Sequence, residues 1–419
     1  MKNSKEHRNM IHYITTEGVA NATVVNELRA VGKAGIPFVL HTMRSPKSTF
    51  FLSPEIENLN KETKSIYPIA IPTFVGSICL APFLFKGRFF KALWNGITGP
   101  RENLAIRAKV LWHLLVACVW VRTIRGEVSL IHSQWIHSCG SIGMYGAWLL
   151  GVPFSFTGHA ADLFRDRAAL IDKIRHASFI ICISSFHRDF YLGLGAEREK
   201  LKIVYCGINT NHFKPKQIDS NTKTKFHVLS AGRLVEKKGF VYLIKAVKIL
   251  LEKGLDIECT IAGSGELENH LNQTISELGL QKNVTVTGEP LLHENIPAFF
   301  QSGDCYCLPC VWASDNDVDG LPQMLMEAMS CEIPAISTRL VGIPDLIEDH
   351  KNGLLVEPND VSSLADSIKM LHDNPDFARK MATEGRKTVE KNFNLETCLE
   401  PLLNKFRNVL NSKNDQHSS

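Results

Sequence analysis

Short apolar runs alternate with stretches of helical period along most of the chain. Runs of about five residues rich in β-branched and aromatic side chains predict buried strands, whereas apolar residues spaced about three and four apart predict helices. In the first half, strands are expected at residues 11–15, 37–42, 128–133, 153–157, 179–184 and 202–205. Helices are expected at residues 21–32, 74–94, 101–125 and 137–150, and after Ser185.

The second half repeats this alternation after a polar stretch, residues 209–225, which has no hydrophobic period and is interpreted as a linker. Strands are expected at residues 227–231, 258–262, 283–287, around Cys305 and at 334–337, and helices at 240–252, from Glu266 and from Pro322. The alternation is typical of parallel βαβ units. No period of about 20–50 residues repeats, which excludes a solenoid.

The pattern therefore predicts an α/β protein with two doubly wound parallel-sheet domains in tandem. We expect the first domain at residues 1–208, the linker at 209–225 and the second domain at 226–394. Each domain is long enough to bury a core of its own.

The composition is that of an ordinary folded protein. The chain has 419 residues, of which 44% are hydrophobic and 21% charged. A net charge of +4 is too small to indicate nucleic-acid binding. The polar amino-terminus does not resemble an export signal, and the most apolar stretch, residues 66–84, is interrupted by prolines and a glycine. We therefore expect a cytoplasmic protein without a transmembrane helix.

The 11 cysteines are scattered among apolar neighbours, which favours buried free thiols over a disulfide framework. Cys305, Cys307 and Cys310 are spaced like metal ligands. A buried strand explains them better, because no second Cys or His pair follows to complete a tetrahedral site.

Ligands of doubly wound sheets bind beyond the carboxyl ends of the strands. The loop after the first strand of the second domain carries Arg233 and Lys238 in front of a helix, which suits a phosphate group. A solvated basic turn is an equally good interpretation of these two residues alone. After the next strand, Gly263 and Gly265 would let a ligand approach the backbone, although Gly-x-Gly lacks the full dinucleotide spacing.

A third loop opens an apolar, Met-rich helix with the sequence DVDGLPQMLMEAM. Gly320, Leu321 and Pro322 lead into this helix, and proline is expected in its first turn, where a missing N–H costs nothing. Asp319 lies in the loop and Glu327 about one turn inside the helix. A buried carboxylate is costly unless a group donates to it. Glu327 therefore indicates a ligand hydroxyl at the mouth of the helix.

At this point the residues resemble a known family. The acid-x7-Glu spacing of Asp319 and Glu327 is similar to the signature of retaining glycosyltransferases of family 4. The segments at 342–345 (GIPD) and 352–356 (NGLLV) resemble later motifs of that family. The segment PFSFTGHAAD, residues 153–162, resembles a loop of its exopolysaccharide, colanic-acid-type branch. The resemblance implies the GT-B architecture, in which two Rossmann-like domains face each other across a cleft and the C-terminal helix, here residues 395–419 with a disordered tail, returns to the first domain.

The resemblance also implies a role for each candidate residue. Arg233 and Lys238 would hold the diphosphate of the donor, Glu327 the ribose of its nucleotide and Asp319 the transferred sugar. Backbone groups at Gly263, Gly265, Gly320, Leu321 and Pro322 would line the nucleotide.

Two candidates come from the first domain. His159 would face the reacting sugar, because it follows a strand beside a glycine. Glu27 resembles an acidic position near the acceptor side of the family, and a solvated helix acid is the equal alternative for it. The family usually has Glu where this chain has Asp319, which shortens the reach of that carboxylate by one methylene.

The implied activity is transfer of a sugar from a nucleotide-diphosphate-sugar to a saccharide or lipid-linked saccharide acceptor, in polysaccharide or lipopolysaccharide assembly, without a cofactor or metal. Asp317 and Asp319 also mimic the Asp-x-Asp metal motif of another glycosyltransferase architecture, but a basic diphosphate site makes a cation redundant. A GT-B-shaped sugar-nucleotide epimerase or phosphorylase and a two-lobed binding protein remain as alternatives; the last is disfavoured by the phosphate loops and by the lack of an export signal.

Residues 74–125 combine many apolar and aromatic side chains with an excess of basic residues. Between Lys86 and Arg125 there are eight basic residues and a single acid, Glu102. Basic-apolar surfaces bind anionic membranes reversibly. This stretch therefore predicts docking on the inner face of the plasma membrane, and packing of the aromatics in the core is the equal alternative.

Overall fold

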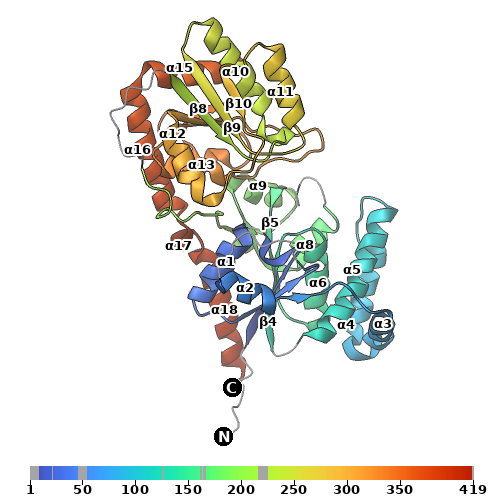
Figure 1. Cartoon of the computed structure of the whole chain (residues 1–419). Coiled ribbons are helices and arrows are strands. Elements are labelled where there is room, and N and C mark those ends of the chain that lie inside the picture. The colour runs from blue at the N-terminus through green and yellow to red at the C-terminus, as the bar shows by residue number, and fades with distance from the viewer. Residues whose placement is uncertain are drawn as a thin grey trace. The chain divides into compact units, whose positions relative to one another are not determined.

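The structure is a computed structural model that describes residues 9–20, 22–45, 54–124, 127–160, 163, 167–215 and 225–417. The chain forms two compact units (Figure 1). Unit 1 comprises Met1–Val204 together with Leu399–Ser419, and unit 2 comprises Tyr205–Cys398. The C-terminal segment thus belongs to unit 1, and residues 209–215 of the expected linker belong to unit 2.

Unit 1 is built on a parallel sheet of seven strands in the order β3-β2-β1-β4-β5-β6-β7. These strands are β1 (Met10–Thr15), β2 (Phe38–Thr42), β3 (Lys64–Ser65), β4 (Val128–Gln134), β5 (Phe154–Gly158), β6 (Ala177–Cys182) and β7 (Leu201–Ile203). The direction of strand addition reverses between β1 and β4. The loops that follow these two strands therefore flank a topological switch point.

The helices of unit 1 are α1 (Ala22–Lys33), α2 (Pro54–Glu62), α3 (Ile71–Phe85), α4 (Gly87–Thr98), α5 (Leu104–Thr123), α6 (Ser138–Leu150), α8 (Leu170–His176), α9 (Ser185–Gly193) and α18 (Glu400–His417). The C-terminal helix α18 is an integral part of this unit. Its buried Phe406 ring lies 5.7 Å from the ring of Tyr13 and 5.3 Å from that of His132.

Unit 2 has a parallel sheet of six strands in the order β10-β9-β8-β11-β12-β13. These are β8 (Phe226–Ala231), β9 (Ile257–Ala262), β10 (Val284–Val286), β11 (Cys305–Leu308), β12 (Ala335–Thr338) and β13 (Leu354–Val356). Its helices are α10 (Phe240–Glu252), α11 (Glu268–Glu277), α12 (Ile296–Ser302), α13 (Gln323–Ser330), α14 (Ile343–Leu346), α15 (Val361–Asp373), α16 (Pro375–Asn392) and α17 (Leu395–Cys398). The switch point of this sheet lies between β8 and β11.

The two doubly wound parallel sheets confirm the predicted fold class. The cysteine run forms the fully buried strand β11, as expected, with Cys305 and Cys307 in the core. One predicted helix is divided in the structure, and the structure contains short strands that the sequence did not predict. The single helix expected at residues 74–94 is two helices, α3 and α4, which meet at 116°. The strands β3 and β13 were not predicted, because each is only two or three residues long.

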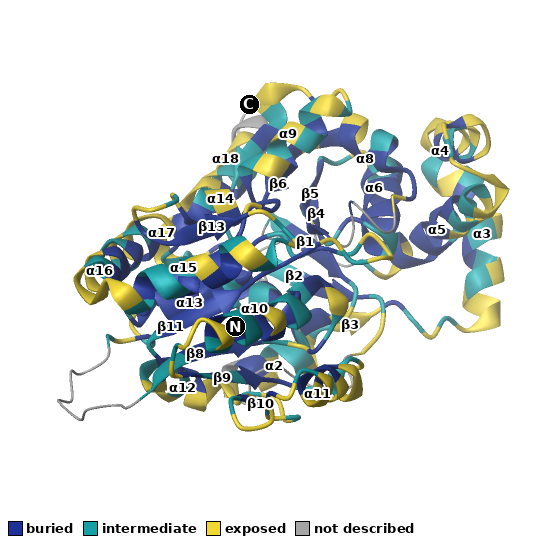
Figure 2. Cartoon of the chain, turned by 90° about the horizontal axis from the view of Figure 1, so that it is seen from above, coloured by how far each residue is buried: buried dark blue, intermediate teal, exposed yellow. Residues whose placement is uncertain are grey.

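Helix α5 is long and apolar enough to cross a membrane by length and composition; among the described residues it is the one single helix with this property. Half of its apolar window is buried, and it packs against α6 in unit 1. Figure 2 shows the contrast with α3 and α4, which are largely exposed.

Candidate functional site

Unit 2 gathers charged side chains where its strand order reverses. Strands β8 and β11 are neighbours, so the loops that follow them leave the same edge of the sheet. The loop after β8 contains a short 3-10 helix, Glu236–Lys238, which carries Lys237 and Lys238. The loop after β11 carries Asp317 and Asp319.

The two lysines and the two aspartates form an ion-pair cluster. Lys238 Nζ lies 2.6 Å from Asp319 Oδ2, and Lys237 Nζ lies 3.0 Å from Asp317 Oδ2 and 3.3 Å from Asp319 Oδ1. Burial alone would raise the pKa of Asp319, but the ammonium groups of Lys238 and Lys237 lower it. Burial alone would lower the pKa of Lys238, but the Asp319 carboxylate raises it. The pair of Lys238 and Asp319 therefore stays charged at neutral pH.

Arg233, in the same loop, is exposed, and its side chain makes no hydrogen bond or ion pair with the residues that the structure describes. Its guanidinium lies close enough to Lys238 to oppose, in part, the rise in the pKa of that lysine caused by Asp319. Arg233 is thus a cation beside the cluster whose planar donors are available to an anion.

Gly263 and Gly265 have a structural role in fixing this loop. Gly263 has a φ of +148°, and a Cβ at this position would lie 1.9 Å from the carbonyl oxygen of Gly232. A Cβ at Gly265 would lie 2.6 Å from the carbonyl oxygen of Leu234. The loop after β9 therefore packs backbone to backbone against the loop that carries Arg233. Contact of these glycines with a ligand stays a prediction.

The segment Gly320, Leu321 and Pro322 leads into α13. The Gly320 carbonyl accepts a hydrogen bond from the Gly342 N–H at 2.8 Å, which ties this segment to the loop after β12, and Leu321 is buried. The sequence had suggested that Pro322 lies in the first turn of the helix. This prediction was wrong, because α13 begins at Gln323 and Pro322 is its N-cap residue. The free N–H groups of the first turn begin directly after it.

Glu327, on α13, is a buried acid with an unsatisfied oxygen. Glu327 is only 7% exposed, and its Oε2 has no hydrogen-bond partner among the described residues. Burial raises the pKa of Glu327 to about 7. An unsatisfied buried acceptor costs about 1–3 kcal/mol. A donor from outside the protein would remove this cost.

In unit 1, an aromatic pair lies at the corresponding edge of the sheet. His159 follows β5 and its ring lies 4.2 Å from the ring of Trp135, which follows β4. Trp135 has a φ of +81°, a strained conformation for a bulky residue, and such strain is concentrated at functional sites. Burial, and then the neighbouring His137, lower the pKa of His159 to about 4. The imidazole is therefore neutral at pH 7.

A hydrogen-bonded chain connects His159 to Glu27. Gln134, the last residue of β4, has its Oε1 3.4 Å from His159 Nε2, and its Nε2 donates to Glu27 Oε2 at 2.7 Å. The Tyr13 hydroxyl donates to Glu27 Oε1 at 3.1 Å. Burial raises the pKa of Glu27 to about 7, although both hydrogen bonds oppose the shift. The alternative that Glu27 is a solvated helix acid is therefore wrong.

Three residues of these sites were not identified from the sequence. Lys237 looked like one of several charges in a basic turn, and only its two aspartate partners distinguish it. Gln134 and Trp135 carry a signal that could have been used, because they follow directly on the strand expected at 128–133, next to the switch point. Asp162, part of the resemblance around His159, lies outside the described residues.

Lys237 and Lys238 contact the two carboxylates that the sequence offered as a possible metal site, Asp317 and Asp319. Both carboxylates are paired with ammonium groups, so a divalent cation would have to displace Lys237 and Lys238 from them. Among the residues described, no cluster of three or more His, Cys, Asp or Glu side chains is arranged to hold a metal. Whether a metal binds at this position stays a prediction.

Two family models match consecutive parts of the chain. The model described as Glycosyltransferase Family 4 matches residues 83–212, and the one described as Glycosyl transferases group 1 matches residues 212–388. The two matches together extend over most of both units.

Curated relatives and a solved structure agree with these matches. The putative colanic acid biosynthesis glycosyltransferase WcaL of Escherichia coli K12 is 32% identical over 221 residues, which is 52% of this chain and 54% of that protein. The amylovoran biosynthesis glycosyltransferase AmsK of Erwinia amylovora is 32% identical over 216 residues, 51% of this chain and 52% of the relative. The chain thus spans about half the length of these curated relatives.

The crystal structure of Anabaena HepE in complex with UDP has a TM-score of 0.68 and 16% sequence identity, and the match covers 95% of this chain and 100% of that one. At this identity the likeness concerns the fold, and it agrees with the two-sheet architecture described above.

Proposed function

Because the chain belongs to the glycosyltransferases of family 4, we propose that it transfers a sugar from a nucleoside-diphosphate donor to a saccharide or lipid-linked saccharide, with retention of anomeric configuration. Polysaccharide assembly in the cytoplasm is the proposed context, since relatives named above belong to colanic acid and amylovoran biosynthesis.

The observation that carries this proposal is a pair of unmatched groups in unit 2. Arg233 is a cation without a partner among the described residues, and Glu327 is a buried carboxyl with an unsatisfied oxygen. A nucleoside diphosphate contains both complements, because its phosphates accept from a guanidinium and its ribose hydroxyls donate to a carboxylate. The Anabaena protein of the same fold was crystallised with UDP, which agrees with this ligand class.

Lys238 and Asp319 would act together in this site. A carboxylate has about four lone-pair positions, so Asp319 can accept about one hydroxyl of the transferred sugar while it still pairs with Lys238 and Lys237 and accepts from the Cys310 thiol. The same pairing holds the Lys238 ammonium in a fixed place for the diphosphate. The one-methylene difference between Asp and the family's usual Glu would set how closely the sugar approaches.

During transfer, the bond between the anomeric carbon and the diphosphate oxygen breaks with its electron pair remaining on the diphosphate, a bond to the acceptor oxygen forms, and the acceptor hydroxyl passes its proton to the departing diphosphate. Negative charge grows on the departing diphosphate, where Arg233 and Lys238 stabilise it. No metal is required for this role. We assign no protein nucleophile. From unit 1, the neutral imidazole of His159, held by Trp135 and Gln134, would contact a hydroxyl of the reacting sugar.

The test is a panel of nucleoside diphosphates and nucleotide sugars, scored first by thermal shift and calorimetry and then by nucleotide release with a saccharide acceptor. One donor should stabilise the protein and release its nucleotide only when an acceptor is present. Product analysis distinguishes transfer from epimerisation, which needs no acceptor, and from phosphorolysis, which needs inorganic phosphate. Failure of every nucleotide to bind would contradict the proposal.

A further inference from the structure

Helix α3 has the reverse of the amphipathic pattern expected in a globular protein. Its buried residues are the small Ser77 and Ala81, whereas large apolar side chains point to the exterior. Ile71 is 78% exposed and Phe83 is 76% exposed. A surface helix normally turns its apolar stripe toward the core. The exposed apolar side of α3 does not pack on the core of unit 1, and we therefore expect it to contact another molecule.

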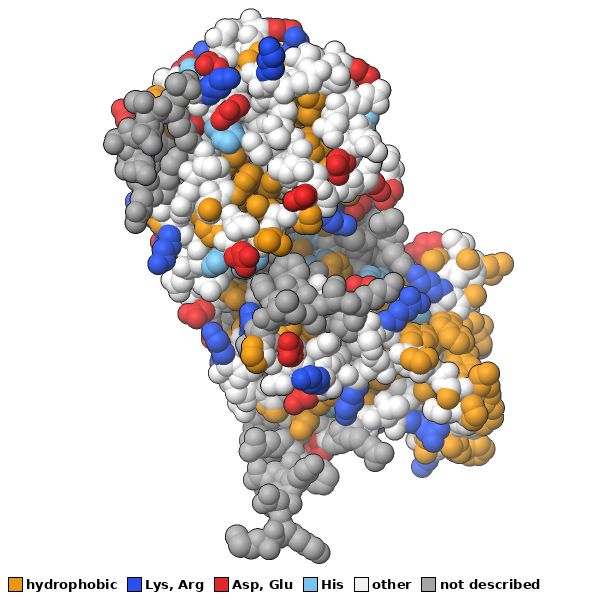
Figure 3. Space-filling view, viewed as in Figure 1, with side chains coloured by type: hydrophobic (Ala, Val, Ile, Leu, Met, Phe, Trp, Pro, Cys, Tyr) orange, Lys and Arg blue, Asp and Glu red, His pale blue; other side chains and the backbone are white. Residues whose placement is uncertain are grey.

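The apolar surface continues over α4 and α5. We call it the α3–α5 apolar face, and it consists of Ile71, Val75, Leu80, Phe83, Leu84, Phe90, Trp94, Ile97, Leu104 and Trp112. Within the described part of the chain, only three other large hydrophobic side chains are exposed, namely Phe186, Leu292 and Trp312. Figure 3 shows hydrophobic side chains gathered over this region of unit 1. Contiguous exposed patches of this kind mark interaction surfaces.

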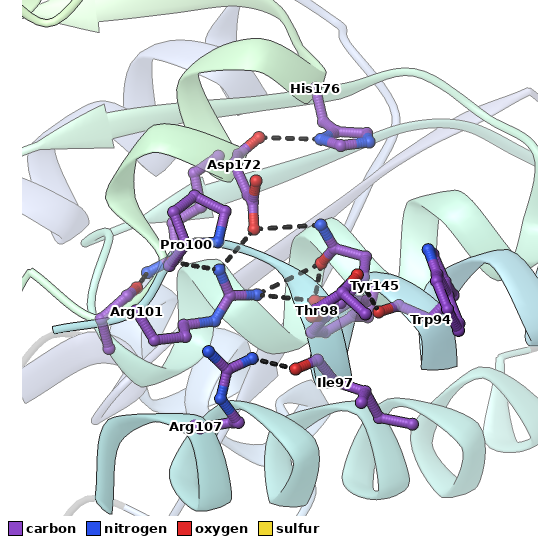
Figure 4. Close-up of polar contacts among 12 residues, drawn as sticks. Trp94, Ile97, Thr98, Pro100, Arg101, Arg107, Tyr145, Asp172 and His176 are labelled. Atoms are coloured by element: carbon purple, nitrogen blue, oxygen red, sulfur yellow. Dashed lines mark hydrogen bonds and ion pairs between the residues drawn. The ribbon is translucent and has the colours of Figure 1, made fainter. Parts of the chain in front are cut away.

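The face is held in place by a polar network beneath α4 (Figure 4). Arg101 Nη1 pairs with Asp172 Oδ2 of α8 at 2.7 Å, and both side chains are almost fully buried. Asn95 Nδ2 donates to the same carboxylate oxygen at 3.1 Å, and the Tyr145 hydroxyl of α6 donates to Asn95 Oδ1 at 2.9 Å. These buried contacts fix α4 against α6 and α8. The exposure of the apolar face is therefore not caused by a poorly packed segment.

Among the basic residues of this region, one group of three is bound to the protein and a second group of three is exposed. Arg101, Arg107 and Arg122 are bound to the protein, through Asp172, the Ile97 carbonyl and the Ser77 hydroxyl respectively. The sequence-based count of eight basic residues thus overstates the charge available at the surface.

The second group lies at the junction of α3 and α4. Lys86, Arg88 and Lys91 are exposed there, and Arg88 uses one nitrogen to donate to the Leu150 carbonyl at 2.8 Å. Glu102 is the only acid between residues 66 and 124. The apolar face is therefore bordered by positive charge.

We propose that the α3–α5 apolar face docks on an anionic lipid bilayer, with Lys86, Arg88 and Lys91 against the headgroups. Each basic residue near an anionic surface contributes about 1 kcal/mol, and the apolar side chains bury themselves at the acyl boundary. A second copy of this chain fits less well, because a symmetric contact would bring the two basic borders together.

The geometry favours a surface-bound arrangement over a membrane span. The 15 residues of α3 are about 22 Å long, shorter than the roughly 30 Å hydrocarbon core, and α4 leaves at 116°. Helix α5 is long enough, but half of its apolar window is buried in unit 1. The helices would therefore lie in the interface.

Flotation with vesicles tests the docking. The full chain should float at low salt with vesicles of phosphatidylcholine and phosphatidylglycerol, and should be released by high salt. Vesicles of phosphatidylcholine alone should bind it much more weakly. The assay contains no nucleotide sugar, so its result is independent of the proposed transferase activity.

Two pairs of variants make the test specific to the face. Phe83→Ser should lower the vesicle partition coefficient several-fold, whereas Leu292→Ser, which removes another exposed large apolar side chain in unit 2, should not. Lys86→Glu/Lys91→Glu should lower it about 10-fold or more, whereas Lys245→Glu/Lys282→Glu changes the net charge equally and should have little effect. Equal losses in test and control variants, or no flotation of the native chain, would overturn the proposal. A dimer in solution that Phe83→Ser dissociates would instead identify the occupant as a second copy.

Discussion

The two sheets share one strand order, but the side chains at their switch points differ in kind. In unit 2 the loops after β8 and β11 present two lysines that are ion-paired with two aspartates, and an exposed arginine beside them. In unit 1 the corresponding edge presents a neutral histidine, a tryptophan and a glutamine. The same scaffold thus offers a charged site suited to a diphosphate and an uncharged one suited to hydroxyl groups.

The difference follows from whether each buried charge has a counter-charge. The Asp319 carboxylate faces two ammonium groups, and its pKa is lowered despite burial. Glu27 faces the neutral side chains of Tyr13, Gln134 and His132, and burial raises its pKa to about 7. His159 is hydrogen-bonded to the neutral Gln134, and burial lowers its pKa to about 4. Burial neutralises ionisable groups unless an opposite charge compensates for it.

The largest effect is expected from removing charge in unit 2. Lys238→Met should lower turnover by about 10²–10³-fold, the loss typical when one preorganised donor to a developing negative charge is removed. It should also weaken binding of the free nucleoside diphosphate. Initial rates and calorimetry with nucleotide alone measure the two effects.

Two variants control for the Lys238 experiment. Asp319→Asn removes the opposite charge of the same ion pair, so it should leave nucleotide affinity unchanged or higher while turnover falls. Lys245→Met removes an exposed lysine of α10 and should change neither quantity. Unaltered nucleotide affinity in Lys238→Met would mean that this lysine serves only to hold Asp319.

The next largest effect concerns Glu327. If its carboxylate accepts the ribose hydroxyls, Glu327→Ala should weaken binding of both the nucleoside diphosphate and the intact donor by about 10–100-fold, the value of a hydrogen bond to a charged group. Calorimetry at pH 8, where the native carboxyl is ionised, gives the comparison. Affinity equal to that of the native protein, with the fold intact, would refute this placement of the nucleotide.

The raised pKa of Glu327 also predicts the pH dependence of stability. Because the folded pKa of about 7 exceeds the ordinary 4.5, the folded protein binds this proton more tightly than the unfolded chain does. The resulting stabilisation is present below pH 4.5 and is lost as the pH rises through 7. The free energy of unfolding of Glu327→Gln, measured relative to that of the native protein, should therefore rise by about 3 kcal/mol when the pH is raised from 4 to 8. Chemical denaturation at the two pH values measures it; a constant difference would show that the carboxyl has a solvated pKa.

The comparison also shows what the sequence could predict. The charged loops of unit 2 were identified because Arg233, Lys238, Asp319 and Glu327 stand out against apolar neighbours and match a family signature. The pairing of Lys238 with Asp319 could not be predicted. It depends on the conformations of the two loops that follow β8 and β11, which are separated by some eighty residues in the sequence. Whether these residues bind the donor stays a prediction.

In unit 1, less of the site could be predicted from the sequence. Glu27 has the sequence context of an ordinary amphipathic helix, and only the tertiary structure places it between Tyr13 and Gln134. The strain at Trp135 has no sequence signal, because nothing in the local pattern requires a positive φ there. Similarly, α3 was expected to be helical, but its outward-facing apolar side became visible only once Ser77 and Ala81 were found buried.

A smaller effect is expected in the uncharged site of unit 1. His159→Ala should lower turnover about 10-fold, the value of one hydrogen bond to a neutral group, and should leave nucleoside diphosphate affinity unchanged, because the nucleotide is assigned to unit 2. Gln134→Leu, which removes the partner of His159 Nε2, should reproduce part of the loss and raise the acceptor KM. A fall in nucleotide affinity in both variants would mean that unit 1 contributes to nucleotide binding.

No effect at all is expected from metal removal. In unit 2, Lys237 and Lys238 already pair with the carboxylates of Asp317 and Asp319 that would otherwise attract a cation, and the exposed Arg233 would supply further positive charge to a diphosphate. Turnover should therefore survive EDTA, with Mg²⁺ and Mn²⁺ adding nothing. If EDTA abolished activity and Mn²⁺ restored it, the lysines would have to leave their aspartates when the donor binds. The charged site would then be a metal site that the ion pairs keep closed in the absence of substrate.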